Sequence, residues 1–309
     1  MTAPASRPSA PTGLLRRLRL YGSMVRYGFA HNQDFAREHW AFFQTMRERL
    51  GEHGIADLER LRAVDVGCGK MMWLTLLMHS VGTRVTGIDT EWVEPNPTFG
   101  KYWGIMRSNG VERAARTLAW DLLYASPYYR ALDGITPFEL HFRDADARAM
   151  SADDLDFETD SIDLAVSHEV FEHLPDVEGA IRELSRVIRP EGLTYVYTHN
   201  YTSISGGHHI AWKYPDTEPS EIVPPWDHLR ENRFPDVPSW INGWREHQYR
   251  EVWERYFEIE DWIPTDREGE ALLTAEIREE LAEYSEQELL TKGFIVVARP
   301  KADSRRVDS

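Results

Sequence analysis

The segment Glu169-Val170-Phe171-Glu172-His173 brings two carboxylates and one imidazole within five residues of each other. In an α-helix, residues three and four positions apart are neighbours, so a helix here would place Glu169, Glu172 and His173 on one face. Carboxylate oxygens and an imidazole nitrogen suit a divalent metal such as Mg²⁺, Mn²⁺ or Zn²⁺. The spacing therefore indicates a candidate metal site.

Further ligands for such a metal would come from elsewhere in the chain. Histidines occur at His199, in the segment 206–209 and in Asp227-His228, and either His208 or His209 could complete the shell. A second interpretation stays open, in which the Glu-His pair serves packing, hydrogen bonding or proton transfer without a metal. The expected ligand set is Glu169, Glu172, His173 and His209.

Histidine is also the side chain that most often acts as a general base. The candidates for removing a proton from an acceptor are His173, His199 and His209. His199 directly follows an expected strand, and open α/β sheets bind ligands beyond the carboxyl ends of their strands. We therefore expect His199 to lie near a bound ligand.

A second chemical signal is the glycine turn Asp65-Val66-Gly67-Cys68-Gly69, which ends a short apolar run. Glycines let the backbone turn sharply and approach a ligand closely. A carboxylate before them would repel a pyrophosphate but suits an ammonium group. Asp89 lies 22 residues after Gly67, near the spacing at which an acidic residue takes ribose hydroxyls. With Met71 where a third glycine often stands, these features disfavour a nicotinamide enzyme.

Strand-like and helix-like segments alternate along the chain, which predicts an α/β fold. We expect a Rossmann-like, doubly wound and mainly parallel sheet of about seven strands. The expected strands include residues 63–66, 83–89, 138–142, 162–167, 193–198 and 293–298; the expected helices are 71–79, 110–132, 177–188, 246–256 (leading into 257–259) and 275–284.

The chain is expected to form one main domain with a helical segment before it and two long inserts, which are usually functional when they occur in compact domains. The second insert is rich in Pro, Trp and His, and could cover a substrate as a lid or pack on the core. The expected boundaries are a disordered tail at 1–13, a helical segment at 14–57, the domain at 58–301 with inserts 91–136 and 200–245, and a disordered tail at 302–309.

Four segments resemble, in order, the motifs of class I S-adenosylmethionine-dependent methyltransferases. They are residues 63–70, 85–89, 160–176 and 183–193, with Glu191 where the family usually has Gly. Each segment alone is a weak signal, but their combination and order are specific. The resemblance implies S-adenosylmethionine as the cofactor and S-adenosylhomocysteine as its product.

The resemblance also implies roles for residues around the cofactor. Gly67 and Gly69 would pass beneath its amino acid part, Asp65 would lie near its ammonium group, and Asp89 would hold the ribose diol. The full set implied is Asp65, Gly67, Cys68, Gly69, Asp89, Thr90, Asp144, Ala145, Asp146, Ser167, His168 and Glu169.

The adenine would meet an Asp-Ala pair after the third strand of such a sheet. Two pairs compete for this role, Asp144-Ala145 and Asp146-Ala147. The alternation of apolar residues in the expected strand 138–142 favours Asp144, and Asp146 is the alternative.

The Glu-x-x-Glu-His segment is similar to the metal-binding motif of small-RNA 3′-terminal 2′-O-methyltransferases and to ubiquinone-pathway O-methyltransferases. The similarity implies a metal that holds an acceptor hydroxyl and lowers its pKa. The expected function is methyl transfer to a small or medium-sized metabolite, with a hydroxyl as the favoured acceptor. The alternative is a protein that binds S-adenosylmethionine without methyl transfer, either regulatory or a lyase or cyclase.

The net charge and composition indicate which kinds of molecule this protein binds. The net charge of −16 disfavours nucleic acid and anionic membranes, which leaves a small-molecule acceptor. Cys68 is the single cysteine, so no disulfide framework is possible and a reducing, cytoplasmic compartment is expected. No apolar run reaches the roughly 18–20 residues that span a membrane. The sequence gives no indication of the oligomeric state.

Overall fold

The structure is a computed structural model, and it describes residues 14–90, 103, 106, 107, 111–235, 237 and 240–302. The expected tail 1–13 and nearly all of the tail 302–309 lie outside the described residues. Most of the first part of the insert 91–136 lies outside them as well.

Seven strands form one mixed sheet in the order β3-β2-β1-β4-β5-β7-β6. β2 is parallel to β1 and β3, β4 is parallel to β5, and β7 is antiparallel to β5 and β6. The expected α/β fold with a doubly wound, mainly parallel sheet is confirmed. The strands are β1 (Arg62–Val66), β2 (Arg84–Asp89), β3 (Asp146–Ala149), β4 (Ile162–His168), β5 (Ile188–His199), β6 (Phe257–Pro264) and β7 (Gly293–Pro300).

The inner strands are almost continuous apolar runs. A parallel sheet covered on both faces buries nearly every side chain of its strands. In β1 only the first residue is exposed, and in β4 only the last residue is not fully buried. These apolar runs are the reason that β1, β2, β4, β5 and β7 could be predicted from the sequence.

The expected strand at 138–142 is wrong, because the third strand is β3. The backbone N–H groups of Leu140 and His141 donate to side-chain oxygens of Asp133 and Ser80, each at 2.8 Å. Side chains from elsewhere in the chain thus satisfy groups that a neighbouring strand would otherwise pair. The alternation of apolar residues reflects the packing of the buried Leu140 in a loop.

The chain divides into two compact units, Pro11–Ser151 with β1–β3 and Ala152–Ser309 with β4–β7. In the first unit, the long helix α1 packs on α2 and α5. The ring of His39 stacks on Trp73 at 4.1 Å, and its Nδ1 lies 2.6 Å from the hydroxyl of Tyr128. No helix in the described residues is long and apolar enough to cross a membrane. The helices of this unit are α1 (Leu14–Glu52), α2 (Trp73–Ser80), α4 (Val111–Trp120), the π-helical turn η1 (Asp121–Ala125) and α5 (Ser126–Asp133).

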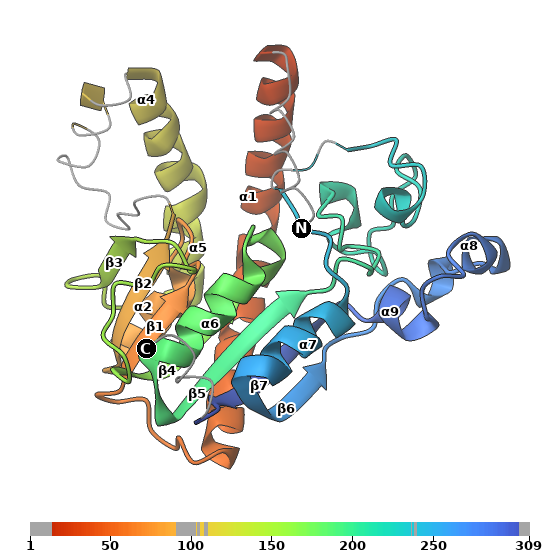
Figure 1. The fold of residues 1–309 in the computed structure, drawn as a ribbon. Helices are drawn as coiled ribbons and strands as arrows, with labels where there is room; N and C mark the ends of the chain where they lie inside the picture. The colour runs from red at the N-terminus through yellow and green to blue at the C-terminus, as the bar shows by residue number, and fades with distance from the viewer. Residues whose placement is uncertain are drawn as a thin grey trace. The chain divides into compact units, whose positions relative to one another are not determined.

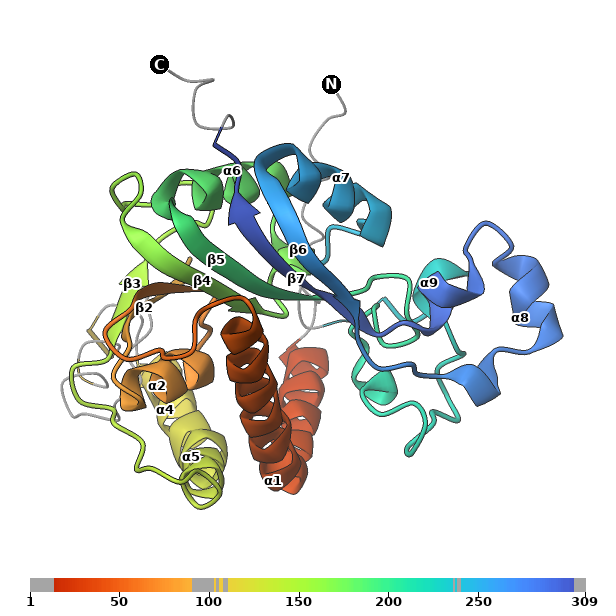
Figure 2. The same ribbon diagram turned by 90° about the horizontal axis from the view of Figure 1, so that it is seen from below.

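In the second unit, α6 and α7 pack beside each other on one face of the strands (Figure 2). The carboxylate of Asp176 accepts a hydrogen bond from the N–H of Gly179 at 2.8 Å and so caps the start of α6. Glu178 on α6 joins α7 through Arg255 and the hydroxyl of Tyr256. The elements are η2 (Phe171–His173), α6 (Val177–Val187), η3 (Ile210–Trp212), η4 (Asp227–Leu229), α7 (Glu246–Tyr256), η5 (Glu270–Leu272), α8 (Ala275–Glu280) and α9 (Glu286–Leu290).

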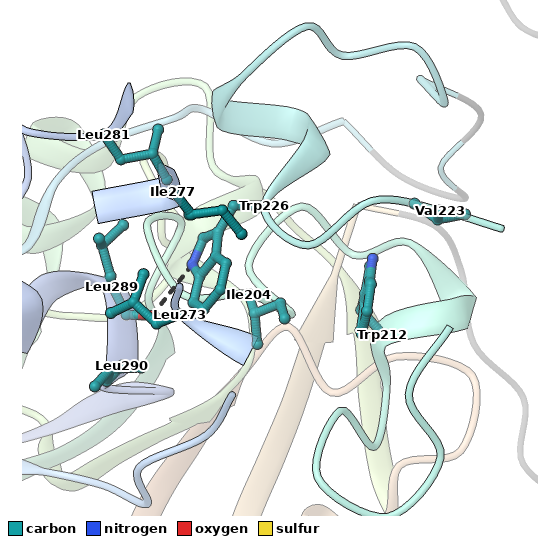
Figure 3. Close-up of a cluster of buried hydrophobic side chains, with 9 residues drawn as sticks. All are labelled: Ile204, Trp212, Val223, Trp226, Leu273, Ile277, Leu281, Leu289 and Leu290. Carbon is teal, nitrogen blue, oxygen red and sulfur yellow. Dashed lines mark hydrogen bonds between the residues drawn. The ribbon is translucent and has the colours of Figure 1, made fainter. Parts of the chain in front are cut away.

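The insert 200–245 has little regular structure, yet it shares a hydrophobic core with the segment that follows β6. It lies beside α8 and α9 beyond the end of β5 (Figure 1). Trp226 is fully buried at the centre of the shared cluster, and its indole N–H donates to the carbonyl of Leu289 at 3.3 Å (Figure 3). We call this cluster the loop core; it consists of Ile204, Trp212, Val223, Trp226, Leu273, Ile277, Leu281, Leu289 and Leu290.

We expect Trp226→Ala to lower the free energy of unfolding by about 3–5 kcal/mol, because it opens a large cavity in the loop core and leaves the Leu289 carbonyl without its donor. Urea denaturation measures the change. Ile222→Ala is the matched control in the same loop, since Ile222 is 78% exposed and its loss is expected to change stability by less than about 0.5 kcal/mol. Equal free energies of unfolding for the two variants would show that the loop core does not stabilise the protein.

Candidate functional site

The first group of expected site residues lies in the unit of β1–β3, at the turn that follows β1. Gly67 and Gly69 have φ angles of 74° and 59°, the left-handed region that favours glycine. The N–H groups of Gly67 and Cys68 donate to the carbonyl of Ile88 at 2.8 and 2.9 Å. The N–H of Gly69 donates to Oδ2 of Asp89 at 3.1 Å. The turn is therefore tied to the carboxyl end of β2, with the Asp89 carboxylate beside it.

Asp65 is buried below this turn, with only 2% of its surface exposed. Its Oδ2 accepts a hydrogen bond from the hydroxyl of Thr75 at 2.6 Å, and burial raises its pKa to about 6. Cys68 is also buried, and burial raises the pKa of its thiol. Thr90 is exposed directly after β2. Asp65 thus joins β1 to α2, while Asp89 and Thr90 lie at the open end of β2.

The structure places neither aspartate weighed for the adenine after the third strand. Asp144 lies in a turn before β3, with a φ of 63° and a side chain that is 86% exposed. Asp146 begins β3, and its Oδ2 accepts hydrogen bonds from Thr86 at 2.9 Å and from Arg148 at 2.8 Å. The expectation that these aspartates follow the third strand came from the strand predicted at 138–142. The residue at the carboxyl end of β3 with a polar side chain is Ser151.

The second group lies in the other unit, at the carboxyl end of β4. Ser167 is fully buried within the strand, and the ring of His168 lies 4.9 Å from that of Tyr197. Glu169 follows with a φ of 55°, and its N–H donates to the carbonyl of Tyr197 at 3.1 Å. The segment is not α-helical, because Phe171–His173 forms one 3-10 turn. Left-handed backbone followed by this turn, rather than a helix face, brings the side chains together.

Five side chains meet after β4 and β5. One ligand atom from each of Glu172, His199 and His208 lies within 4.8 Å of the other two. Oε1 of Glu172 is 3.9 Å from Nε2 of His173 and 3.8 Å from Nε2 of His208. Oε1 of Glu169 is 3.8 Å from Nδ1 of His199. We call these five residues the Glu-His cluster.

Asn242 and Trp240 fix the turn that carries Glu172 and His173. The side chain of Asn242 donates to the carbonyl of Phe171, and its backbone N–H donates to the carbonyl of Glu172, both at 2.8 Å. Nδ1 of His173 lies 2.7 Å from the carbonyl of Trp240. A carbonyl only accepts, so Nδ1 carries the proton and Nε2 presents its lone pair to Glu172.

His209, the expected metal ligand, is not part of the Glu-His cluster. Its Nδ1 accepts a hydrogen bond from the N–H of Ala211 at 3.1 Å and caps η3. His208 has a left-handed φ of 54°, and it is His208 whose ring lies beside His173 and His199, each at 4.8 Å. The structure thus brings His208 to the position proposed for His209.

Burial and neighbouring charges shift the pKa values of the two carboxylates in opposite directions. Burial raises the pKa of Glu172 well above its usual range, and the charge of Glu169 raises it further. Burial also opposes ionisation of Glu169, but the charge of Lys213 holds its pKa well below its usual range. Burial lowers the pKa of His208 to about 4 and that of His199 well below its usual value. Both imidazoles are therefore neutral at pH 7 and carry a lone pair.

A pocket of about 390 Å³ opens within the insert 200–245. Its walls are mainly aromatic and aliphatic, and its polar groups include His209 and Asn232. Gly207 and His209, which flank His208, and Trp240, whose carbonyl binds His173, also line it. The pocket and the Glu-His cluster therefore share backbone segments. The remaining lining residues are Tyr201, Ile204, Trp212, Val223, Asp227, His228, Phe234, Pro235, Val237 and Ile241.

Comparison with known proteins decides the family. A family model described as a methyltransferase domain matches residues 33–257, well over half of the chain. The chain belongs to this methyltransferase family. It is an S-adenosylmethionine-dependent enzyme of class I, as the order of its sequence motifs predicted.

Curated relatives of this methyltransferase include ubiquinone biosynthesis O-methyltransferases. The one from Cupriavidus pinatubonensis is 23% identical over 65% of this chain and 65% of its own length. The one from Sinorhizobium medicae is 27% identical over 51% of each chain. This chain thus spans about half to two thirds of their length. A solved S-adenosylmethionine-dependent methyltransferase from Mesorhizobium loti is 20% identical, with a TM-score of 0.46 over 84% of this chain and 96% of its own.

Sequence reasoning missed residues of this methyltransferase that act through backbone groups or from distant segments, such as Asn242. A local signal was present in the pair Gly206-Gly207. A Cβ at Gly206 would come within 2.2 Å of the carbonyl oxygen of Asn200, and one at Gly207 would come within 2.5 Å of the ring of His228. Two glycines that other chain segments approach this closely mark a loop packed around a site.

We expect Gly87→Ala to lower the free energy of unfolding by about 1–3 kcal/mol. The added Cβ would lie 2.7 Å from the hydroxyl of Thr75 and 3.0 Å from Cys68, so it would displace the hydroxyl that serves the buried Asp65. Gly51→Ala is the control, because Gly51 is helical with no atom within 4 Å of a new Cβ, and it should gain up to about 1 kcal/mol. Thermal unfolding of both variants measures the effect. If Gly87→Ala unfolds at the same temperature as the wild type, Thr75 and Cys68 can move aside without cost and the prediction is wrong.

Proposed function

We propose that this methyltransferase transfers the methyl group of S-adenosylmethionine to a hydroxyl of a small or medium-sized metabolite, with a divalent metal bound by the Glu-His cluster. The observation that carries the proposal is the meeting of two carboxylates with three neutral imidazoles after β4 and β5. The names of the curated relatives as O-methyltransferases support a hydroxyl acceptor.

The donor set fits a metal. Both carboxylate oxygens of Glu172 and Nε2 of His208 are buried and make no hydrogen bond to any described residue. Unpaired polar groups in a protein interior are costly, and a cation between them would satisfy all three. Nε2 of His173 also points its lone pair at Glu172, since its other nitrogen is held by a carbonyl. Such a second hydrogen bond is the usual arrangement of a metal-binding histidine.

We infer that Glu169, Glu172, His173 and His208 are metal ligands. The mixture of carboxylate oxygens and imidazole nitrogens suits Mn²⁺, Zn²⁺ or Mg²⁺. When bound, the metal would hold an acceptor hydroxyl and lower its pKa. The protein side chains would orient this oxygen toward the methyl group, because transfer from an activated sulfonium depends mainly on positioning and on loss of the acceptor's proton.

For the donor, we propose that the glycine turn and Asp89 hold the amino acid part and the ribose of S-adenosylmethionine. The carboxylate of Asp89 lies beside the turn at the carboxyl end of β2, where doubly wound sheets bind nucleotides. The carbonyl of Asp89 accepts the N–H of Met150, so Ser151 follows directly beside it. We therefore assign the adenine contact to Ser151 in place of Asp144 or Asp146.

For the acceptor, we propose the pocket in the insert 200–245. Its volume of about 390 Å³ suits a medium-sized metabolite, and its aromatic walls suit an apolar or ring-bearing molecule. Trp212 lines the pocket, and its indole N–H is buried with no partner among the described residues, so we propose it as a donor to the acceptor molecule. The net charge of −16 supports a small molecule over a nucleic acid.

We expect Asp89→Ala to weaken binding of S-adenosylhomocysteine about 10- to 100-fold, the effect of losing charge-assisted hydrogen bonds to the ribose. Isothermal titration calorimetry gives the dissociation constants. Asp144→Ala is the matched control and should bind like the wild type. A wild type that binds neither S-adenosylmethionine nor S-adenosylhomocysteine would overturn the proposed donor site, and a large effect of Asp144→Ala would overturn the adenine assignment.

For the metal, we expect protein purified without chelator to contain close to one divalent ion per chain. Glu172→Gln should lower the affinity for Mn²⁺ by at least about 100-fold, because even the partners of ligands contribute 10- to 100-fold. His209→Ala, next to a proposed ligand but outside the cluster, should keep the wild-type affinity. Elemental analysis and Mn²⁺ titration measure both. Wild type that holds no metal, together with turnover that survives EDTA, would rule the metal out.

A further inference from the structure

A buried chain of hydrogen bonds runs from the Glu-His cluster into the protein interior. Nε2 of His199 lies 2.7 Å from the hydroxyl of Ser205, and that hydroxyl lies 2.5 Å from Oε1 of Glu268. The three residues are 4–5% exposed. Glu268 comes from the segment after β6, more than 60 residues further along the chain. Its N–H donates to the carbonyl of Leu290 at 2.9 Å, which anchors it beside the loop core.

The carboxylate of Glu268, at the end of this chain, determines which atom donates in each of its hydrogen bonds. Oε1 of Glu268 also accepts the backbone N–H of Ser205, at 3.0 Å. Because this oxygen accepts two donors, the hydroxyl of Ser205 points its proton at Glu268. The Ser205 oxygen is then an acceptor toward His199. The Ser205 oxygen, at 2.7 Å, is much nearer to Nε2 of His199 than the Ser203 hydroxyl, at 3.5 Å. Nε2 therefore carries the proton and Nδ1 the lone pair.

The lone pair on Nδ1 of His199 faces another acceptor. Oε1 of Glu169 lies 3.8 Å from it, and no proton is available on either atom to join them. The His199 ring also lies 4.8 Å from that of His208, whose Nε2 has no hydrogen-bond partner among the described residues. This arrangement favours a cation between the acceptors.

We propose that Glu268 is a positioning residue that acts through Ser205 to hold His199 in the Nε2–H tautomer, with its Nδ1 lone pair presented to the Glu-His cluster as a further metal ligand. The part of the proposal that concerns the metal rests on the proposed function. Glu268 itself touches neither metal nor substrate. Its contribution is to fix the tautomer and orientation of a ligand, as carboxylates behind metal-binding histidines do.

The test combines a spectroscopic signature with metal affinity. Long-range ¹H–¹⁵N spectra of the metal-free wild type should show His199 as the Nε2–H tautomer, and Ser205→Ala should lose this preference. Ser205→Ala should also lower the affinity for Mn²⁺ by about 10- to 100-fold, and Glu268→Gln should lower it by less, because the amide oxygen still accepts. Thr202→Val is the matched control: its buried hydroxyl, in the same loop, donates to the carbonyl of Glu288 and not to His199.

The outcomes separate the two proposals. An Nδ1–H tautomer of His199 in the wild type, or a tautomer and Mn²⁺ affinity unchanged in Ser205→Ala, overturns the role of Glu268 even if the protein binds Mn²⁺. An Nε2–H tautomer that depends on Ser205, in a wild type that binds no Mn²⁺, supports the positioning role and overturns the metal. Equal losses of affinity in Thr202→Val and Ser205→Ala would reduce the effect to loop packing and overturn the positioning role.

Discussion

Two carboxylates that are close together in a protein interior repel each other, and together with burial this repulsion sets the ionisation of the Glu-His cluster. Glu169 and Glu172 therefore differ in ionisation, because the pKa of Glu169 is held low and the pKa of Glu172 is raised. The imidazoles around them are neutral, and His173 and His199 direct their N–H groups at Trp240 and Ser205, so their other nitrogens add acceptors to the site. Under the proposed function, a cation bound here would satisfy these acceptors and offset the repulsion between the carboxylates. The surrounding backbone holds the acceptors in place.

That arrangement uses unfavourable backbone conformations. Glu169 and His208 both adopt left-handed φ angles, which cost non-glycine residues of the order of 1–3 kcal/mol each. Such conformations persist only where the surroundings fix them. For His208 the loop core supplies this support, because the fully buried Trp226 and its neighbours join the insert 200–245 to the segment that follows β6. For Glu169 the hydrogen bond from its N–H to the carbonyl of Tyr197 on β5 contributes. An insert with so little regular structure can therefore hold His208 in place and, through Trp240 and Asn242, fix the turn of Glu172 and His173.

The sequence predicted the features that depend on hydrophobic runs and on short motifs. The strands from β1 to β7 other than β3 and β6 followed from their apolar residues, and the turn after β1 followed from its two glycines. The strand at 138–142 was wrong because Asp133 and Ser80 pair its backbone, an effect of distant side chains that alternation cannot show. The substitution of His208 for His209 depends on one left-handed φ angle. No local pattern of the sequence encodes that angle, and none joins Glu268 to His199.

The burial of the histidines also bears on whether the Glu-His cluster activates the acceptor through a bound metal or through a histidine that acts as a general base. An imidazole whose pKa has fallen to about 4, as at His208, remains neutral at pH 7 but takes a proton from a hydroxyl only with a large energetic cost. Burial thus weakens each histidine of the cluster as a base while it leaves their lone pairs intact as ligands. The sulfonium of the donor is already activated, so the difficult requirement is the acidity of the acceptor. A cation bound among these lone pairs meets that requirement directly, whereas any one of the histidines acting alone does not.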